Sequence, residues 1–403
     1  MNKETVIVRE SYDWLTENKV GSDKYEALIK YIEMKYPNER IIEQQYRRLR
    51  FINYVGVIVC SGVRYEIIPK INLSIDDERQ ALLSMLSITN FLPISFHERV
   101  KTGEGKNDLL SAFLTAFIER LLFELKKGVY KTYETSTDNL HVLKGKLEVT
   151  QHIQKNAFHK AKAYCSFDEY TENNLLNQLF KAALMIVRQD TEKHTLKLDM
   201  ERCLGYLEHV DLFNFDAAKL DQIFFNRQNE RFWDAAIFAK LIVENASIYS
   251  RGRQSTSFSF LFPMNLLFEK YIEVALREAV GAEQVKNQHA EKRLLRNRKS
   301  GYRNILLKPD FVIDQTLILD TKWKSATYNE RTNYNQADIY QMYAYVTAYQ
   351  KAERCILLYP NQEKEADHPL WEVIDTNKTI EMHTVRIDEF QKTIKELKEI
   401  MDA

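Results

Sequence analysis

Two short apolar runs in the last third of the sequence carry two acids and a lysine, and they constrain the fold of this chain most. The runs are residues 308–313 (KPDFVI) and 317–322 (LILDTK). Each has the length and composition of a strand buried in a sheet, and Asp314-Gln315 between them predicts the turn of a hairpin. If the two strands pair, Asp310 and Asp320 converge at one end of the hairpin.

The residue types at these positions point to metal-dependent chemistry. Side chains two apart on a strand share a face, so Asp320 and Lys322 point the same way while Thr321 faces the other way. Mg²⁺ takes oxygen ligands, usually one or two carboxylates completed by water and phosphate. A nearby lysine orients or helps to deprotonate an attacking water and offsets charge on the phosphate. The pattern indicates cleavage of a phosphodiester; for the motif alone, a solvated hairpin remains the alternative.

A helix is predicted before the hairpin, because apolar residues recur at helical spacing over residues 264–276. Pro263 at its start fits the first turn of a helix. Glu269 lies beside the apolar stripe, so two readings stay open: an additional metal ligand, or an ordinary carboxylate on the helix surface.

A second helix is predicted after the hairpin, over residues 335–349, and Gln341 and Tyr345 share one of its faces because they are four apart. Residues 354–360 (RCILLYP) form an apolar run that ends in proline, as a buried strand does. The order helix, hairpin, helix, strand predicts an α/β core with a mixed sheet.

A basic segment leads into the hairpin and is the predicted DNA contact. A cationic ribbon beside the acids would neutralise phosphates and fix the strand near the metal. A solvated basic turn around Ser300-Gly301 is the alternative. The predicted DNA-binding residues are Lys292, Arg293, Arg296, Arg298, Lys299 and Arg303.

The rest of the chain predicts an α+β, multidomain protein. Residues 1–75 form a β-rich domain that is a possible partner contact, and residues 76–250 form a mainly helical domain that includes a strand excursion over 136–154. Residues 251–403 form the α/β domain with the mixed sheet. The expected amino-terminal elements are strands over 5–8, 51–60 and 63–71, with a turn at Ser61-Gly62, and a helix over 22–36. The expected helices of the middle domain cover 108–127, 172–188 and 229–248.

Together, these motifs resemble a known family. Pro309-Asp310 followed by Asp320-x-Lys322 is similar to the PD-(D/E)xK nuclease superfamily, and Gln341-x-x-x-Tyr345 is similar to an element of RecB-related nucleases. In combination they resemble McrC, the nuclease subunit of McrBC-type restriction systems. The segments that carry this resemblance are 268–269, 308–310, 320–324 and 340–345, with looser matches at 65–71, 143–147 and 168–173.

The resemblance implies a Mg²⁺-dependent DNA endonuclease with a restriction-endonuclease-like domain, which acts with an McrB-like AAA+ GTPase that recognises and translocates DNA. Asp310, Asp320 and Glu269 are the expected metal ligands, and Lys322 assists the water. Gln341 and Tyr345 complete the expected catalytic set by steadying the lysine or the phosphate. A non-catalytic adaptor that activates a partner NTPase and a standalone nuclease remain open alternatives.

Composition sets the remaining bounds. The 403 residues include 57 Lys+Arg and 57 Asp+Glu, so net charge makes no global case for nucleic-acid binding. The 4 cysteines form no Cys-x-x-Cys pair, which argues against a zinc knuckle or a disulfide framework.

No apolar run approaches membrane-spanning length and no secretory signal is present, so we expect a cytoplasmic protein that does not bind a membrane. Residues 102–107 (TGEGKN) lack the features of a phosphate-cradling loop, so any nucleotide hydrolysis is expected in another subunit.

Overall fold

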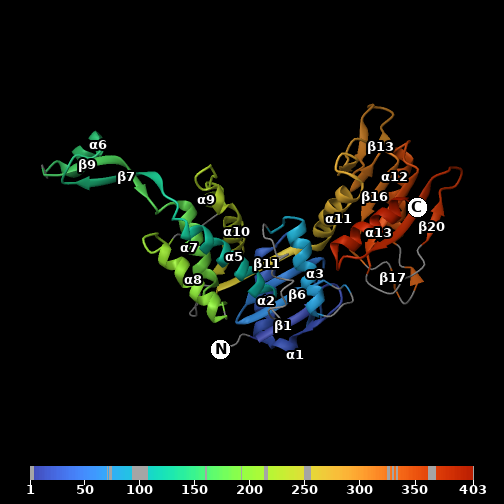
Figure 1. Cartoon of the computed structure of the whole chain (residues 1–403), viewed down its shortest axis with the longest axis horizontal. Helices are drawn as coiled ribbons and strands as arrows, with labels where there is room; N and C mark the ends of the chain where they lie inside the picture. The colour runs from blue at the N-terminus through green and yellow to red at the C-terminus, as the bar shows by residue number, and fades with distance from the viewer. Residues whose placement is uncertain are drawn as a thin grey trace. The chain divides into compact units, whose positions relative to one another are not determined.

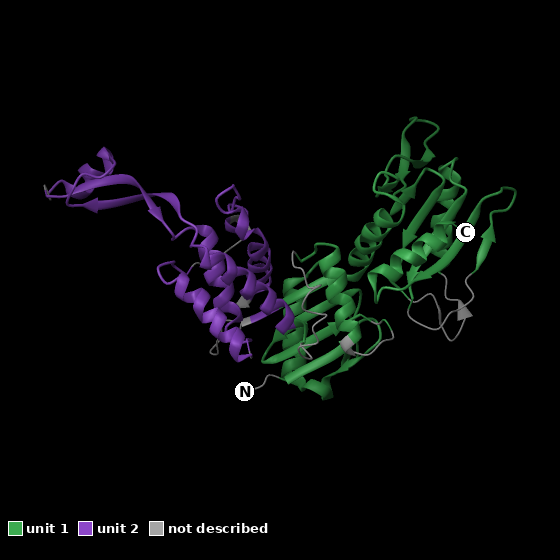
Figure 2. Cartoon of the chain, in the orientation of Figure 1, with its two compact units in different colours: residues 1, 3–109, 259–403 green, residues 2, 110–258 purple. Residues whose placement is uncertain are grey.

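The computed structural model describes residues 4–69, 71, 75–92, 108–158, 161–191, 193–212, 217–248, 256–324, 327–328, 331–332, 335–361 and 369–402. Apart from the first two residues, the chain divides into two compact units (Figure 2). Residues up to 109 join residues 259–403 in one unit, and residues 110–258 form the other. The three-domain division of the sequence stays a prediction. The glycine-lysine segment at 102–107 lies outside the described residues.

The amino-terminal part of the first unit is built on a sheet in which four strands follow the order β1-β6-β5-β11. Their bounds are β1 (Glu4–Arg9), β5 (Tyr54–Cys60), β6 (Val63–Ile68) and β11 (Thr256–Pro263). β1 is parallel to β6, and β5 is antiparallel to it across the predicted Ser61-Gly62 turn. Helix α2 (Ser22–Lys35) buries Leu28, Tyr31 and Ile32 in the core of this part.

The predicted strand over residues 51–60 is interrupted. Phe51 ends β4 (Arg48–Phe51), Asn53 has a positive φ of 58°, and β5 begins at Tyr54. β4 pairs with β3 (Ile42–Gln45) and with β2 (Leu15–Thr16) in a small separate sheet. A turn in the left-handed region therefore separates two sheets where one continuous strand was expected. Helices α1 (Glu17–Val20) and α3 (Ile75–Ile88) complete this part.

The second unit is mainly helical, as expected for the middle of the chain, with α5 (Leu109–Lys126), α7 (Leu175–Val187), α8 (His194–Tyr206), α9 (Ala217–Leu220), η1 (Glu230–Phe232) and α10 (Trp233–Asn245). A long β arm extends from these helices (Figure 2). It pairs β7 (Thr132–Leu140) with β9 (Ala163–Thr171) and adds β8 (Lys146–Leu147) and α6 (Val149–Asn156). The strand excursion is therefore longer than predicted and contains a helix. β10 (Ser247–Ile248) pairs with the first residues of β11.

The carboxyl-terminal part of the first unit holds a six-stranded mixed sheet of order β12-β15-β16-β19-β21-β20 (Figure 1). Its strands are β12 (Val285–Asn287), β15 (Phe311–Ile313), β16 (Leu317–Thr321), β19 (Arg354–Pro360), β20 (Leu370–Glu372) and β21 (Thr379–Val385). The same part contains three helices: α11 (Met264–Val280), α12 (Gln336–Ala348) and α13 (Phe390–Asp402). It also contains two hairpins, β13 (Arg293–Arg296) with β14 (Arg303–Leu306), and β17 (Thr327–Tyr328) with β18 (Arg331–Thr332).

The spacing of apolar residues in the sequence explains these elements. α11 buries its side chains at 264, 267, 268, 271, 272, 275 and 276, which are the positions of the predicted apolar stripe. β19 is buried from Cys355 to Pro360, as a central strand with neighbours on both sides must be. The predicted mixed sheet and the predicted α+β class are confirmed. Among the described helices, none combines the length and the hydropathy that crossing a membrane requires.

Candidate active site

The predicted hairpin is present. β15 and β16 pair antiparallel, with Phe311 opposite Leu319. Asp314 and Gln315 between them have φ values of 47° and 64°, so both lie in the left-handed region, and the backbone N–H of Thr316 donates to the Ile313 carbonyl at 3.2 Å to close the turn. In this register Asp310, the residue before β15, and Asp320, near the end of β16, lie at the same end of the hairpin.

Asp320 is a buried carboxylate with incomplete pairing. Asp320 is 1% exposed to solvent. Its Oδ2 forms an ion pair with Lys322 Nζ, but no described atom gives this oxygen a contact with hydrogen-bond geometry. Burial, followed by the negative charge of Asp310, raises the pKa of Asp320 despite the opposing effect of Lys322. A cation at this position would therefore relieve both the desolvation and the repulsion between the acids.

Lys322 is held in place by a relay from α12. Its Nζ donates to Gln341 Oε1 at 3.1 Å, and Gln341 Nε2 donates to Tyr345 Oη at 2.7 Å. Tyr345 Oη in turn donates to the carbonyl oxygen of Lys308 at 2.9 Å. Burial lowers the pKa of Lys322, but the nearby carboxylates, Asp320 first, outweigh it and raise that pKa. The lysine is thus a fixed, protonated donor beside the acids.

The relay connects predicted site residues that are distant in sequence. Burial raises the pKa of Tyr345, so the hydroxyl stays a hydrogen-bond donor. The sequence left open whether Gln341 and Tyr345 contact the lysine or a phosphate, and the structure places Gln341 on Lys322. Their spacing of four on α12 lets one side chain bond directly to the other.

Asp310 is tied to β16 through one oxygen. Its Oδ2 accepts hydrogen bonds from the backbone N–H and from Oγ1 of Thr321, both at 2.7 Å. Thr321 was expected to face away from Asp320 and Lys322, and it nevertheless contacts the first acid. The bonds to Thr321 fix the orientation of the Asp310 carboxylate.

Glu269 on α11 is partly buried and lies within the electrostatic reach of Asp310. Burial and then the charge of Asp310 raise its pKa, while a hydrogen bond from Gln288 opposes that shift. Gln288 Nε2 donates to Glu269 Oε1 at 3.1 Å, and the backbone N–H of Gln288 donates to the Asp310 carbonyl at 2.7 Å. Gln288 therefore joins the helix that carries Glu269 to the strand end that carries Asp310.

Three residues near the site were not singled out in the sequence. Gln288 is one, and the others are Lys324 and Asp338, whose Nζ and Oδ2 form an ion pair. The charge of Asp338 contributes to the raised pKa of Lys322. Spacing offered a signal for both, because Asp338 lies one helical turn before Gln341 and Lys324 lies two residues after Lys322. Gln288 offered no such signal.

The donor chemistry of the site suits Mg²⁺. Within the described ranges, no group of at least three His, Cys, Asp or Glu side chains is arranged as a metal cage. Mg²⁺ commonly uses only one or two protein carboxylates and keeps several waters. The buried Asp320 carboxylate, which is ion-paired with Lys322, and the Asp310 carboxylate that interacts with it electrostatically provide such a set.

The basic segment forms the two-stranded hairpin β13–β14, which we call the basic hairpin (residues 292–306). Arg293 pairs with Leu306 and Arg296 with Arg303 across it, and all eight strand residues are exposed. Asn297 Oδ1 accepts from the backbone N–H groups of Lys299 and Ser300, which orders the turn. The six predicted DNA-binding cations are exposed and none forms an ion pair with a described acid.

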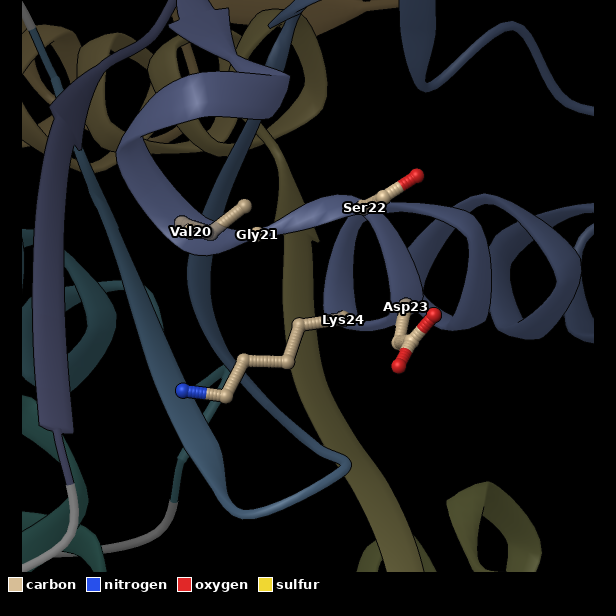
Figure 3. Close-up of a pocket in the computed structure, with 5 residues that line it drawn as sticks. All are labelled: Val20, Gly21, Ser22, Asp23 and Lys24. Carbon is tan, nitrogen blue, oxygen red and sulfur yellow. The ribbon is translucent and has the colours of Figure 1, made fainter.

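A shallow pocket lies elsewhere, at the junction of α1 and α2. It is lined by Val20, Gly21, Ser22, Asp23 and Lys24 (Figure 3). It contains none of the predicted site residues. The fold and the site together define a mixed α+β protein whose carboxyl-terminal sheet carries an acid, acid, lysine set, with an exposed basic hairpin directly before β15 in the chain.

Comparison with known proteins gives the family. Residues 49–360 match the family described as McrBC 5-methylcytosine restriction system component, so the chain belongs to this family. The resemblance to McrC is confirmed. A search of curated proteins found no match to the sequence.

Two solved structures share the fold. A chain of the Thermococcus gammatolerans half-complex of McrB AAA+ hexamers with bound McrC has a TM-score of 0.73 and 20% identity, with 98% of this chain and 100% of that chain covered. A chain of the cryo-EM structure of the Thermococcus gammatolerans McrBC complex has a TM-score of 0.53 and 22% identity, with 68% and 88% covered. At these identities the likeness concerns the fold alone.

Proposed function

We propose that this chain is the nuclease subunit of an McrBC-like restriction complex, a Mg²⁺-dependent DNA endonuclease of the PD-(D/E)xK type. The observation that carries the proposal is the buried Asp320–Lys322 pair, whose lysine is fixed by the Gln341–Tyr345 relay. A buried acid with a raised pKa beside a second acid and a lysine is costly to maintain. Such arrangements concentrate at catalytic sites.

Each residue has a role that follows from its contacts. Asp310 and Asp320 would hold Mg²⁺, and Glu269, which Gln288 links to the backbone of Asp310, would join them from α11 once the ion is bound. When bound, the ion supplies a Lewis acid for the phosphate and lowers the pKa of a bound water. Lys322, protonated and fixed in position, donates to the phosphate and offsets the negative charge that develops during attack.

DNA would be held beside this centre by the basic hairpin. A two-stranded β ribbon fits the major groove of B-form DNA. The exposed cations of the basic hairpin match the phosphates on either side of such a groove. Tyr302, 74% exposed at its turn, adds an aromatic surface for sugars or bases.

The proposed partner is an McrB-like AAA+ GTPase that recognises and translocates the DNA. The similar chain of known structure comes from an assembly of McrB AAA+ hexamers with bound McrC. Residues 102–107 lack the features of a phosphate-cradling loop, which agrees with nucleotide hydrolysis in another subunit. Stimulation of the partner's GTPase and a cytoplasmic place of action belong to the same proposal.

The test reconstitutes the complex from this chain, its AAA+ partner, GTP, Mg²⁺ and DNA. We expect DNA cleavage by the wild-type complex and none by Lys322→Ala, while assembly and GTP hydrolysis persist. Cleavage at the wild-type rate by Lys322→Ala would contradict the proposal. Stimulated GTP hydrolysis without any cleavage would favour the non-catalytic adaptor, and robust cleavage by the isolated chain would favour a standalone nuclease.

A further inference from the structure

A buried carboxylate of the amino-terminal sheet reaches the nuclease site. Glu10 directly follows β1 and is 2% exposed. Its Oε2 accepts from Ser11 Oγ at 2.6 Å and from the backbone N–H of Asn53 at 3.1 Å. Its Oε1 accepts from the indole Nε1 of Trp323 at 2.6 Å. The contacts of this carboxylate thus include donors of the amino-terminal part and a donor of the carboxyl-terminal part.

Trp323 connects the segment that carries Lys322 with the helix that carries Glu269. It directly follows Lys322 in the chain, and its ring centroid lies 5.5 Å from that of Phe268, the residue before Glu269. The backbone N–H of Lys322 donates to the Leu358 carbonyl, so the strand register continues to this point. Beyond it, the hydrogen bond from Trp323 to Glu10 and the ion pair of Lys324 with Asp338 anchor the chain.

We propose that Glu10 is a positioning residue for the cutting site and that it acts through Trp323. Its hydrogen bond holds the end of β16, and therefore Lys322, against Asp320 and Gln341. The proposal rests on the proposed nuclease function. It also makes the amino-terminal sheet a part of the active-site framework, so that a change in this sheet alters the rate of DNA cleavage.

The physical basis is the cost of breaking this bond. Hydrogen bonds to an ionised carboxylate are shorter and roughly twice as strong as neutral ones, and a buried carboxylate that loses a donor remains partly unsatisfied. The strand end and the sheet therefore move together. Displacing a reacting group by about 1 Å can cost about 100-fold in rate.

The main test is Trp323→Phe, which keeps an aromatic ring against Phe268 and removes only the N–H donor. The matched control is Trp14→Phe, because the ring of Trp14 contacts the guanidinium groups of Arg48 and Arg50. In the reconstituted complex we expect Trp323→Phe to lower kcat for cleavage about 10- to 100-fold. The KM for DNA and the stimulated GTP hydrolysis stay at wild-type values, the Tm falls because the buried Glu10 carboxylate loses a donor, and Trp14→Phe cuts normally.

A kcat of Trp323→Phe equal to that of the wild type would overturn the proposal. So would a loss of cleavage that is matched by an equal loss of GTP hydrolysis, because that is the result of a merely structural role. If instead the wild-type complex does not cut, or Lys322→Ala cuts normally, the proposed function itself has failed.

A second measurement does not depend on cleavage. ¹⁹F NMR of the chain labelled with 5-fluorotryptophan reports on each indole, and Trp323→Phe identifies the resonance of Trp323. We expect this resonance to shift on Glu10→Gln and on Lys322→Ala, and to stay in place on Asp314→Ala in the exposed hairpin turn. A Trp323 resonance that is insensitive to both Glu10 and Lys322 would contradict the link between the sheet and the site.

Discussion

Tyr345→Phe tests the relay that holds Lys322 with the loss of a single oxygen atom. The substitution keeps the ring buried and removes two hydrogen bonds, from Gln341 Nε2 at 2.7 Å and to the Lys308 carbonyl at 2.9 Å. At about 1 kcal/mol for each net hydrogen bond, the loss is about 2 kcal/mol. Gln341 then loses the contact that points its Oε1 toward Lys322, and the lysine gains freedom to move.

The expected kinetic effect follows from this magnitude. If the whole of about 2 kcal/mol appears in the barrier, the rate of DNA cleavage falls about 30-fold. The assay is single-turnover cleavage by the reconstituted complex at saturating DNA, which isolates the chemical step from binding. The matched control is Tyr343→Phe on the same helix, where the side chain is 53% exposed and the same atom is removed.

The two variants separate the relay from a general effect on α12. We expect Tyr343→Phe to cut at the wild-type rate and Tyr345→Phe to cut slowly, with partner GTP hydrolysis normal in both. A wild-type rate for Tyr345→Phe would refute the reasoning, because Lys322 would then need no support from Gln341. An equal loss in both variants would also refute it.

Three further predictions concern the DNA contact, the buried ion pair and the amino-terminal sheet. Replacing the strand arginines of the basic hairpin (Arg293, Arg296 and Arg303) by glutamine should weaken DNA binding. In a filter-binding titration, the slope of log K against log [salt] should become shallower by about 0.9 for each lost phosphate contact. Burial raises the pKa of Glu381, but hydrogen bonds from Arg354, His383 and Thr379 outweigh it and lower that pKa overall. The ionised carboxylate therefore stabilises the fold above its unfolded pKa of about 4.3, and the Tm difference between wild type and Glu381→Gln should shrink as pH falls below that value. Gly56→Ala should abolish the cooperative melting of the amino-terminal sheet, since its Cβ would lie 1.8 Å from the backbone oxygen of Phe260.

Local patterns predicted much of the carboxyl-terminal fold. The hairpin turn at Asp314-Gln315, helix α11 and the buried strand β19 follow from spacing and composition that a short window contains. The shared helix face of Gln341 and Tyr345 also followed from spacing, since residues four apart on a helix are neighbours, and the structure joins them by a hydrogen bond. These are features in which neighbours in sequence are neighbours in space.

Contacts between distant segments could not be predicted in this way. Glu10 and Trp323 are separated by 313 positions, and Gln288 meets Glu269 across 19. The break between β4 and β5 depends on the positive φ of Asn53, which a run of apolar residues does not reveal. Periodicity determines which face of an element is buried, whereas the partner of that face depends on the topology of the whole sheet.

The most direct test of a cutting centre at this hairpin compares two acids on it. Asp320→Ala removes the buried carboxylate in β16, and Asp314→Ala removes an exposed carboxylate from the turn of the same hairpin. The measurement is DNA cleavage by the complex with its AAA+ partner, GTP and Mg²⁺. The account predicts no cleavage by Asp320→Ala and wild-type cleavage by Asp314→Ala, with GTP hydrolysis intact in both. Wild-type cleavage by Asp320→Ala would show that the DNA is cut elsewhere.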